Sequence, residues 1–149
     1  MCRQKWCTLL LAISLLLNIA LCIWGVNMQI EQEELKFIQR KADQTFHQSF
    51  SDLHGHFCRI PTDEADWDVW FAEGEIYARA CWHQLGISSF ADDDELSDIF
   101  HQLTIRFTFS EGAPSDMIPE SVVEALGRLH VNMEDSALKS EIHAALCSD

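Results

Sequence analysis

The hydrophobic residues divide the chain into one uninterrupted apolar run and several periodic stretches. The run extends from Cys7 to Val26 and contains no charged residue. Twenty residues of α-helix rise about 30 Å, which matches the hydrocarbon core of a bilayer. Trp6 and Trp24 lie near its ends, where aromatic side chains prefer the membrane interface. The pattern therefore predicts a transmembrane anchor over residues 7–26.

The charges beside this run predict its orientation. Arg3 and Lys5 precede it, whereas acidic residues follow it from Glu31 onward. The positive-inside rule then leaves residues 1–6 as a cytoplasmic tail and residues 27–149 as an extracytoplasmic domain. We expect a single-pass protein of the cell membrane.

A cleaved secretion signal is the alternative interpretation of the same run. Small residues at Ala20 and Cys22 fit the two positions that a signal peptidase reads. The apolar stretch, however, continues through Ile23, Trp24 and Val26 instead of ending there. We therefore favour a retained signal-anchor, with a secreted helical domain, released after cleavage near Cys22, as the alternative.

Beyond the run, apolar residues recur at spacings of three and four, which is typical of one face of a helix. No proline or glycine run separates this stretch from the anchor, so one helix is predicted to continue outward. The face packs either on the domain's own helices, which we favour, or on a second copy of the chain, which would make a homo-oligomer. Its members are Leu35, Ile38, Ala42, Phe46, Phe50 and Leu53.

Helical periodicity returns in four later stretches. Gly55 and Pro61 are expected to end the first exported helix, and further helices are predicted over about 63–85, from about 92 to 109, from 119 onward and from about 132 to 146. The expected N-terminal caps or first residues are Thr62, Ser89, Pro119 and Asn132.

One of these stretches is ambiguous. Residues 103–109 also alternate with a period of two, which is typical of a strand, but no second segment could pair with them. We expect a helix there and a loop over residues 110–116. The predicted fold class is all-α: a single N-terminal transmembrane helix followed by a small extracytoplasmic bundle of about four to five helices.

Charge excludes some partners. The segment 27–149 carries eight of the ten basic residues and all 24 acidic residues, a formal charge of −16. Such a surface repels phosphates, so no nucleic acid partner is expected. A basic protein or a cation remains compatible, as does a surface kept soluble by its charge.

Three cysteines lie in the exported part. In an oxidising compartment two of them would pair, and the sequence leaves all three pairings open. We favour a disulfide between Cys58 and Cys81, with Cys147 free or linking two chains.

A cluster of imidazoles and thiols permits a metal site. Histidine and cysteine are ligands that zinc and copper prefer. Residues two apart on a helix point about 200° apart, so Cys81 and His83 cannot both reach one ion. The candidate metal ligands are His54, His56, Cys58, Cys81 and His83.

Catalytic signatures are absent from the sequence. It has no glycine-rich phosphate loop, GxSxG elbow, HExxH or CxxC, so we expect no enzyme and no cofactor. The expected function is a membrane protein whose acidic helical domain mediates protein–protein interaction. A membrane-tethered module that binds or senses zinc or copper is the alternative.

Overall fold

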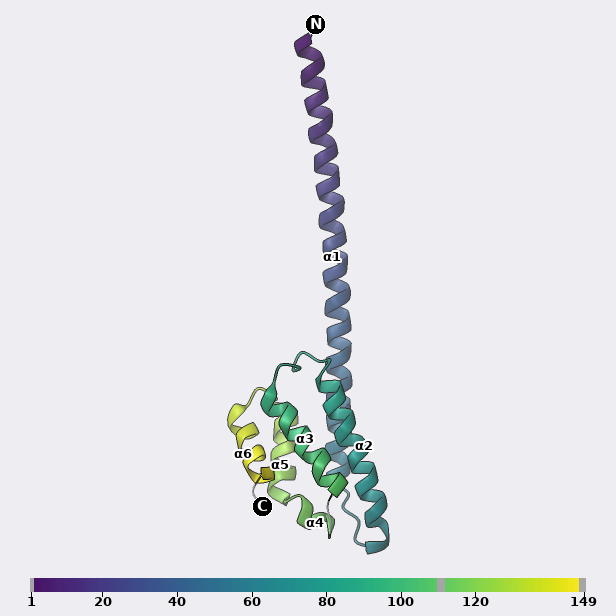
Figure 1. The fold of residues 1–149 in the computed structure, drawn as a ribbon, viewed down its shortest axis with the longest axis vertical. Coiled ribbons are helices and arrows are strands. Elements are labelled where there is room, and N and C mark those ends of the chain that lie inside the picture. Colours follow the sequence, from purple (N-terminus) through teal and green to yellow (C-terminus); the bar gives the residue numbers. More distant parts are fainter. Residues whose placement is uncertain (1, 110–111, 148–149) are drawn as a thin grey trace. The chain divides into compact units, whose positions relative to one another are not determined.

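The computed structural model describes residues 2–109 and 112–147, with side chains from Ile13 onward. Within these residues every regular element is a helix, and none is a strand (Figure 1). The all-α prediction is confirmed. In chain order the elements are α1 (Cys2–Phe57), a 3₁₀ turn (Glu64–Asp66), α2 (Trp67–Leu85), α3 (Asp94–Phe109), α4 (Pro114–Met117), α5 (Glu120–Val131) and α6 (Ser136–Cys147).

The chain forms two units, Met1–Ile38 and Gln39–Asp149. The first unit consists of the N-terminal part of α1. By length and composition α1 could cross a membrane, and none of its most apolar window is buried within the protein. No other helix of the described chain has this property.

The helix α1 runs without interruption past Gly25, as predicted, but its end was predicted wrongly. It continues beyond Leu53 and Gly55 and ends at Phe57. Phe57 is 2 % exposed, so the additional turn brings one more ring into the core of the second unit. That burial outweighs the modest cost of a glycine within a helix.

The last turns of α1 supply an aromatic face to the core of the second unit. Phe46 and Phe50 are fully buried and meet Phe100 of α3 edge-on, with ring centroids 5.7 and 5.1 Å apart. Phe57 stacks on Phe107, also from α3, at 5.5 Å. This part of the predicted face therefore packs on the domain's own helices.

The two earlier members of the predicted face behave differently. Leu35 and Ile38 lie in the first unit and are 66 % and 63 % exposed. The apolar periodicity therefore extends across the boundary between the two units, but the buried members of this face all lie in the second unit.

Helices α2 and α3 lie side by side in the second unit, and α6 packs along α3 (Figure 1). Gly74 of α2 marks the closest approach, because a Cβ atom there would lie 2.0 Å from the Phe107 ring. Residues 103–109 are helical: Leu103 and Phe107 are buried, whereas Ile105 and Phe109 are 36 % and 76 % exposed. Burial follows the helical period instead of the alternation typical of a strand.

Several helix starts lie a few residues beyond the predicted caps. Asp63, Asp93 and Asp135 take the capping role, since each accepts a hydrogen bond at 3.0 Å from a backbone N–H two or three residues later. Pro119 is the N-cap of α5 and not its first residue, and Asn132 is the C-cap of α5. At each of these three helix starts an aspartate carboxylate caps the helix in place of the predicted Thr62, Ser89 or Asn132. A negative charge also interacts favourably with the positive end of the helix dipole.

Two basic side chains join α6 to α3. Lys139 is 6 % exposed and forms an ion pair with Asp93. Arg106 donates to the carbonyl oxygen of Leu146 at 2.6 Å and to that of Met117, in α4, at 2.8 Å. Residues 114–116, at the end of the predicted loop 110–116, belong to this one-turn helix, which Arg106 holds against the bundle. Residues 110–111 lie outside the described part.

Candidate functional site

The predicted metal ligands do not converge. His56 is 7 % exposed and its ring stacks on Trp70 at 4.8 Å. Its Nε2 atom lies 2.9 Å from the Trp70 carbonyl oxygen. Since a carbonyl can only accept, Nε2 carries the hydrogen. Burial lowers the pKa of His56, although the Trp70 carbonyl and Glu73 act to raise it, so the side chain is a neutral part of the core.

The expected disulfide between Cys58 and Cys81 is not supported. Both thiols are free, as is Cys147. Cys81 is fully buried on α2, where burial and the charge of Asp52 raise the pKa of its thiol. Cys58 follows the last residue of α1 and is exposed. The sequence could not show this separation because it depends on how α2 packs against α1.

Of the five candidates, only His54 and Cys58 come together, with Nε2 and Sγ 4.0 Å apart. His83 is exposed beside the Trp82 ring. Within the part of the chain that the structure describes, no three or more His, Cys, Asp or Glu side chains are arranged to hold a metal ion.

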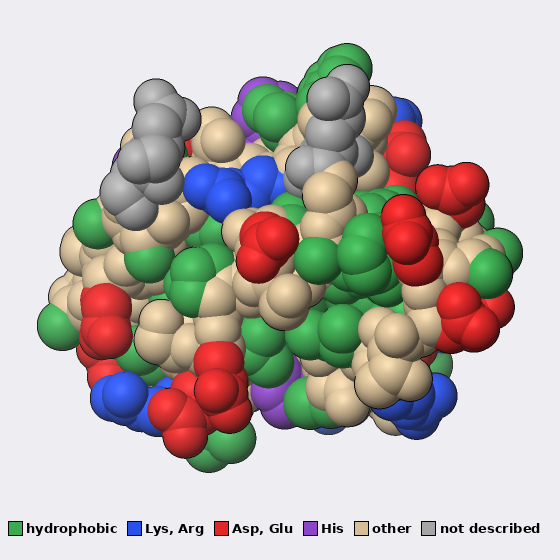
Figure 2. Space-filling model, turned by 90° about the horizontal axis from the view of Figure 1, so that it is seen from below, with side chains coloured by type: hydrophobic (Ala, Val, Ile, Leu, Met, Phe, Trp, Pro, Cys, Tyr) green, Lys and Arg blue, Asp and Glu red, His purple; other side chains and the backbone are tan. Residues whose placement is uncertain are grey.

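A groove lies where the end of α1 meets α4 and α5. We call it the α1–α5 groove; its volume is about 550 Å³. Its apolar lining comprises the buried Phe57 and Ile118, the partly buried Val123 and the 41 % exposed Ile60. The remaining lining residues are His54, Cys58, Ser115, Glu120 and Glu124. The end of the second unit at which α4 lies shows apolar side chains gathered in its middle, with acidic side chains among and around them (Figure 2).

Only part of this groove is apparent from the sequence. The types of side chain at His54 and Cys58 indicate metal or thiol chemistry, whereas Glu120, Glu124 and Ile60 belong to no recognisable motif. The spacing of Glu120 and Glu124, one turn apart on α5, was the available signal. That Phe57 and Ile118 meet beside them depends on long-range packing, which periodicity does not encode.

A second, more polar groove lies over α2, α3 and α6, and most of its polar groups pair with one another. Glu95 accepts from Ser140 at 3.1 Å, and Asp98 pairs with His143. The Trp82 indole donates to Ser97 at 3.3 Å. These contacts explain the acidic start of α3 as part of the bundle's own structure.

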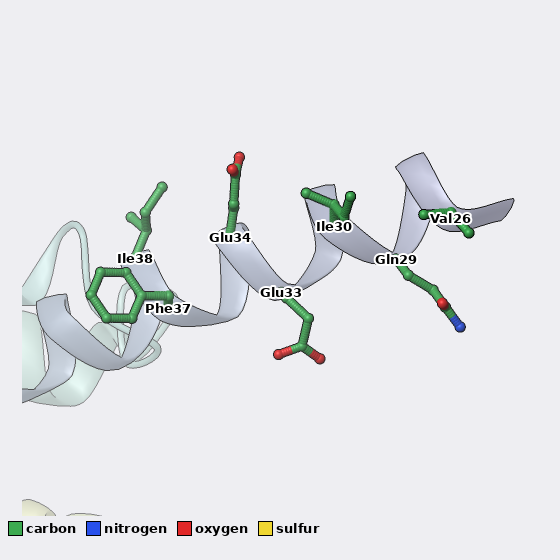
Figure 3. Close-up of a pocket in the computed structure, with 7 residues that line it drawn as sticks. All are labelled: Val26, Gln29, Ile30, Glu33, Glu34, Phe37 and Ile38. Atoms are coloured by element: carbon green, nitrogen blue, oxygen red, sulfur yellow. The ribbon is translucent and has the colours of Figure 1, made fainter. Parts of the chain in front are cut away.

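A third hollow lies on the first unit and is formed by α1 alone (Figure 3). Ile30, Glu34 and Ile38 point to one side of the helix and Gln29 and Glu33 to the other. No second element encloses a ligand there, so this surface is an exposed helix face and not a binding pocket.

Comparisons with known proteins supply no relative on which to base a function. No protein-family model, no curated protein and no solved structure matches this chain.

Proposed function

We propose that this chain is a single-pass membrane protein, with Arg3 and Lys5 on the cytoplasmic side, whose acidic helical domain binds another protein outside. The observation that carries the proposal is the exposure of the apolar part of α1. Between Ile13 and Val26 its large aliphatic and aromatic side chains are 47–67 % exposed. An apolar surface of this kind is unfavourable in water and favourable in hydrocarbon.

The domain 39–149 supports the second half of the proposal. It has a buried core of its own, and the absence of catalytic motifs from the sequence leaves recognition as the simplest role for it. Its strong negative charge favours a partner with basic residues and disfavours anionic lipid or nucleic acid.

Membrane fractionation of the full chain tests the anchor. We expect the protein to stay in membranes after an alkaline carbonate wash. Replacing Leu16 and Ile19 together by arginine should release it, because each arginine at the centre of a span costs about 2.5–3.5 kcal/mol. The matched control replaces Leu35 and Ile38 by arginine, which adds the same charge outside the apolar run and should leave the protein in the membrane.

Two outcomes would overturn the anchor. One is release of the unsubstituted chain by the carbonate wash. The other is a mature chain in the medium that begins near Ile23, which would identify the run as a cleaved secretion signal. Digestion of residues 39–149 by protease added outside intact cells tests the orientation, and protection of those residues would contradict it.

A further inference from the structure

We infer that the α1–α5 groove is the docking site for a basic, amphipathic segment of the partner protein. The inference rests on the proposed function, since it says which surface of the domain makes the contact and what chemistry the partner brings.

The lining of the groove suits a large apolar side chain. Phe57 and Ile118 are 2 % and 3 % exposed, so they form a floor that belongs to the core. Ile60 is 41 % exposed at its edge. A partly enclosed hollow with an apolar floor is the type of place in which a leucine or phenylalanine anchor of a partner contributes most to binding.

Contacts within the domain hold both walls of the groove. Arg106 holds α4, the element just before Ile118, through its bond to the Met117 carbonyl. On the opposite wall the His54 ring lies directly against α5, because a Cβ atom on Gly127 would come within 2.7 Å of its Nε2 atom. A preformed groove spares the entropy cost of ordering loops on binding.

The charges of the groove select a basic partner. Glu120 and Glu124 are both exposed and one turn apart on α5. Within the described residues, neither side chain makes a hydrogen bond or an ion pair. Among the residues that the structure describes, no lysine or arginine lines the groove. In the polar groove over α3, by contrast, Glu95 pairs with Ser140 and Asp98 with His143.

The apolar floor and the acidic rim of the groove together fit one class of partner segment. An amphipathic helix that inserts one or two large apolar residues, with lysine or arginine beside them, satisfies both. The net charge of the domain would also steer such a segment towards it. We therefore assign the groove to a helical, basic segment of another protein.

Cys58 provides a local readout, because it lines the groove and is free and exposed. The experiment uses the full chain in nanodiscs of zwitterionic lipid. The probe is a synthetic amphipathic peptide of leucine and lysine, about 18 residues or five helical turns long. Labelling of each cysteine by a maleimide is followed by mass spectrometry. We expect the peptide to slow the labelling of Cys58 and to leave that of Cys147, on α6, unchanged.

Variants then test the groove itself. Replacing Glu120 and Glu124 by lysine should raise the peptide concentration needed for protection at least about tenfold. The control replaces Glu134 and Glu141 by lysine, an equal charge change at exposed sites outside the groove, and should have little effect. Ile60→Asp should also abolish protection. Since Ile60 is exposed, that substitution leaves the core intact, and an unreactive Cys81 verifies folding in every variant.

Several outcomes would overturn the inference. The first is that the peptide slows the labelling of Cys58 and Cys147 equally, and the second is that a leucine–glutamate peptide protects Cys58 equally well. The third is that the two double variants weaken protection by the peptide to the same extent. The fourth is that the lipid alone protects Cys58. A chain retained in washed membranes whose Cys58 is not protected would overturn the groove and leave the anchor standing. A secreted chain whose Cys58 is protected by the peptide would overturn the anchor and leave the groove standing.

Discussion

At the scale of single residues, His56 shows why chemical identity alone misassigns a side chain. As one of a cluster of histidines and cysteines it was a reasonable metal ligand. In the structure its ring stacks on Trp70, and the two residues exchange hydrogen bonds, since the Trp70 indole donates to the His56 carbonyl at 3.4 Å. The partner lies on another helix, so the local sequence contains no sign of it.

His56 should make the domain sensitive to acid. Its pKa lies below the unfolded value of 6.5 because burial outweighs the opposing effects of the Trp70 carbonyl and Glu73, with Arg59 lowering it further. The unfolded chain then binds more protons, so this contribution to stability is complete above pH 6.5 and is lost as the pH falls through the folded pKa. We expect the free energy of unfolding, measured with urea, to fall less between pH 7.5 and 5.5 for His56→Gln than for the unsubstituted chain.

The exposed His83 provides the control for that measurement. The free energy of unfolding of His83→Gln should change with pH as much as that of the unsubstituted chain, because the His83 side chain is exposed to solvent. An identical pH dependence for His56→Gln and His83→Gln would contradict the assignment.

At the scale of elements, periodicity predicted the five longer helices but not the one-turn α4, whose residues 114–116 were expected in a loop. The periodicity places Trp70, Gly74, Ala78, Cys81 and Leu85 on the buried face of α2. It did not predict where helices begin. Asp93, for example, caps α3 and also binds Lys139 from α6. A cap that serves two elements is selected by tertiary contacts that a local pattern does not contain.

The contact between α2 and α3 should tolerate no side chain at position 74. Gly74→Ala places a Cβ atom against the Phe107 ring, and overpacking of this kind costs about 1–3 kcal/mol. Gly55→Ala is the control, because nothing lies within 4 Å of the added atom in α1. It should stabilise the domain by about 0.5–1 kcal/mol, since alanine favours a helix interior. Chemical unfolding measures both, and a Gly74→Ala variant as stable as Gly55→Ala would contradict this packing.

At the scale of the whole molecule, the sequence predicted that the apolar N-terminal run and the stretch after it form one continuous helix. The boundary between Ile38 and Gln39 could not be predicted, because the apolar pattern continues unchanged across it. Only the presence of covering helices distinguishes Phe46, which is fully buried, from Leu35, which is exposed. The grooves depend on the same long-range packing.

The state of the thiols reports on the second unit as a whole. Cys58 and Cys147 are exposed and should react with a maleimide quickly, whereas Cys81 is fully buried with a raised thiol pKa. We expect Cys81 to react only when denaturant unfolds the unit, at the denaturant concentration at which helical structure is lost. Recovery of a peptide containing Cys58 linked to Cys81 from the native chain would contradict the free thiols.

The position of the aromatic face on α1 has a consequence for biosynthesis. Phe46, Phe50 and Phe57 are made before every helix that covers them. At the usual rate of translation the remaining chain takes about 5–20 s to appear. During that time the three phenylalanines are exposed, because the residues of α3 against which they pack have not yet been synthesised. Asp43 and Asp52 flank Phe46 and Phe50. Charges beside an exposed apolar segment slow its aggregation, so we expect these two aspartates to protect the nascent chain until α3 is synthesised.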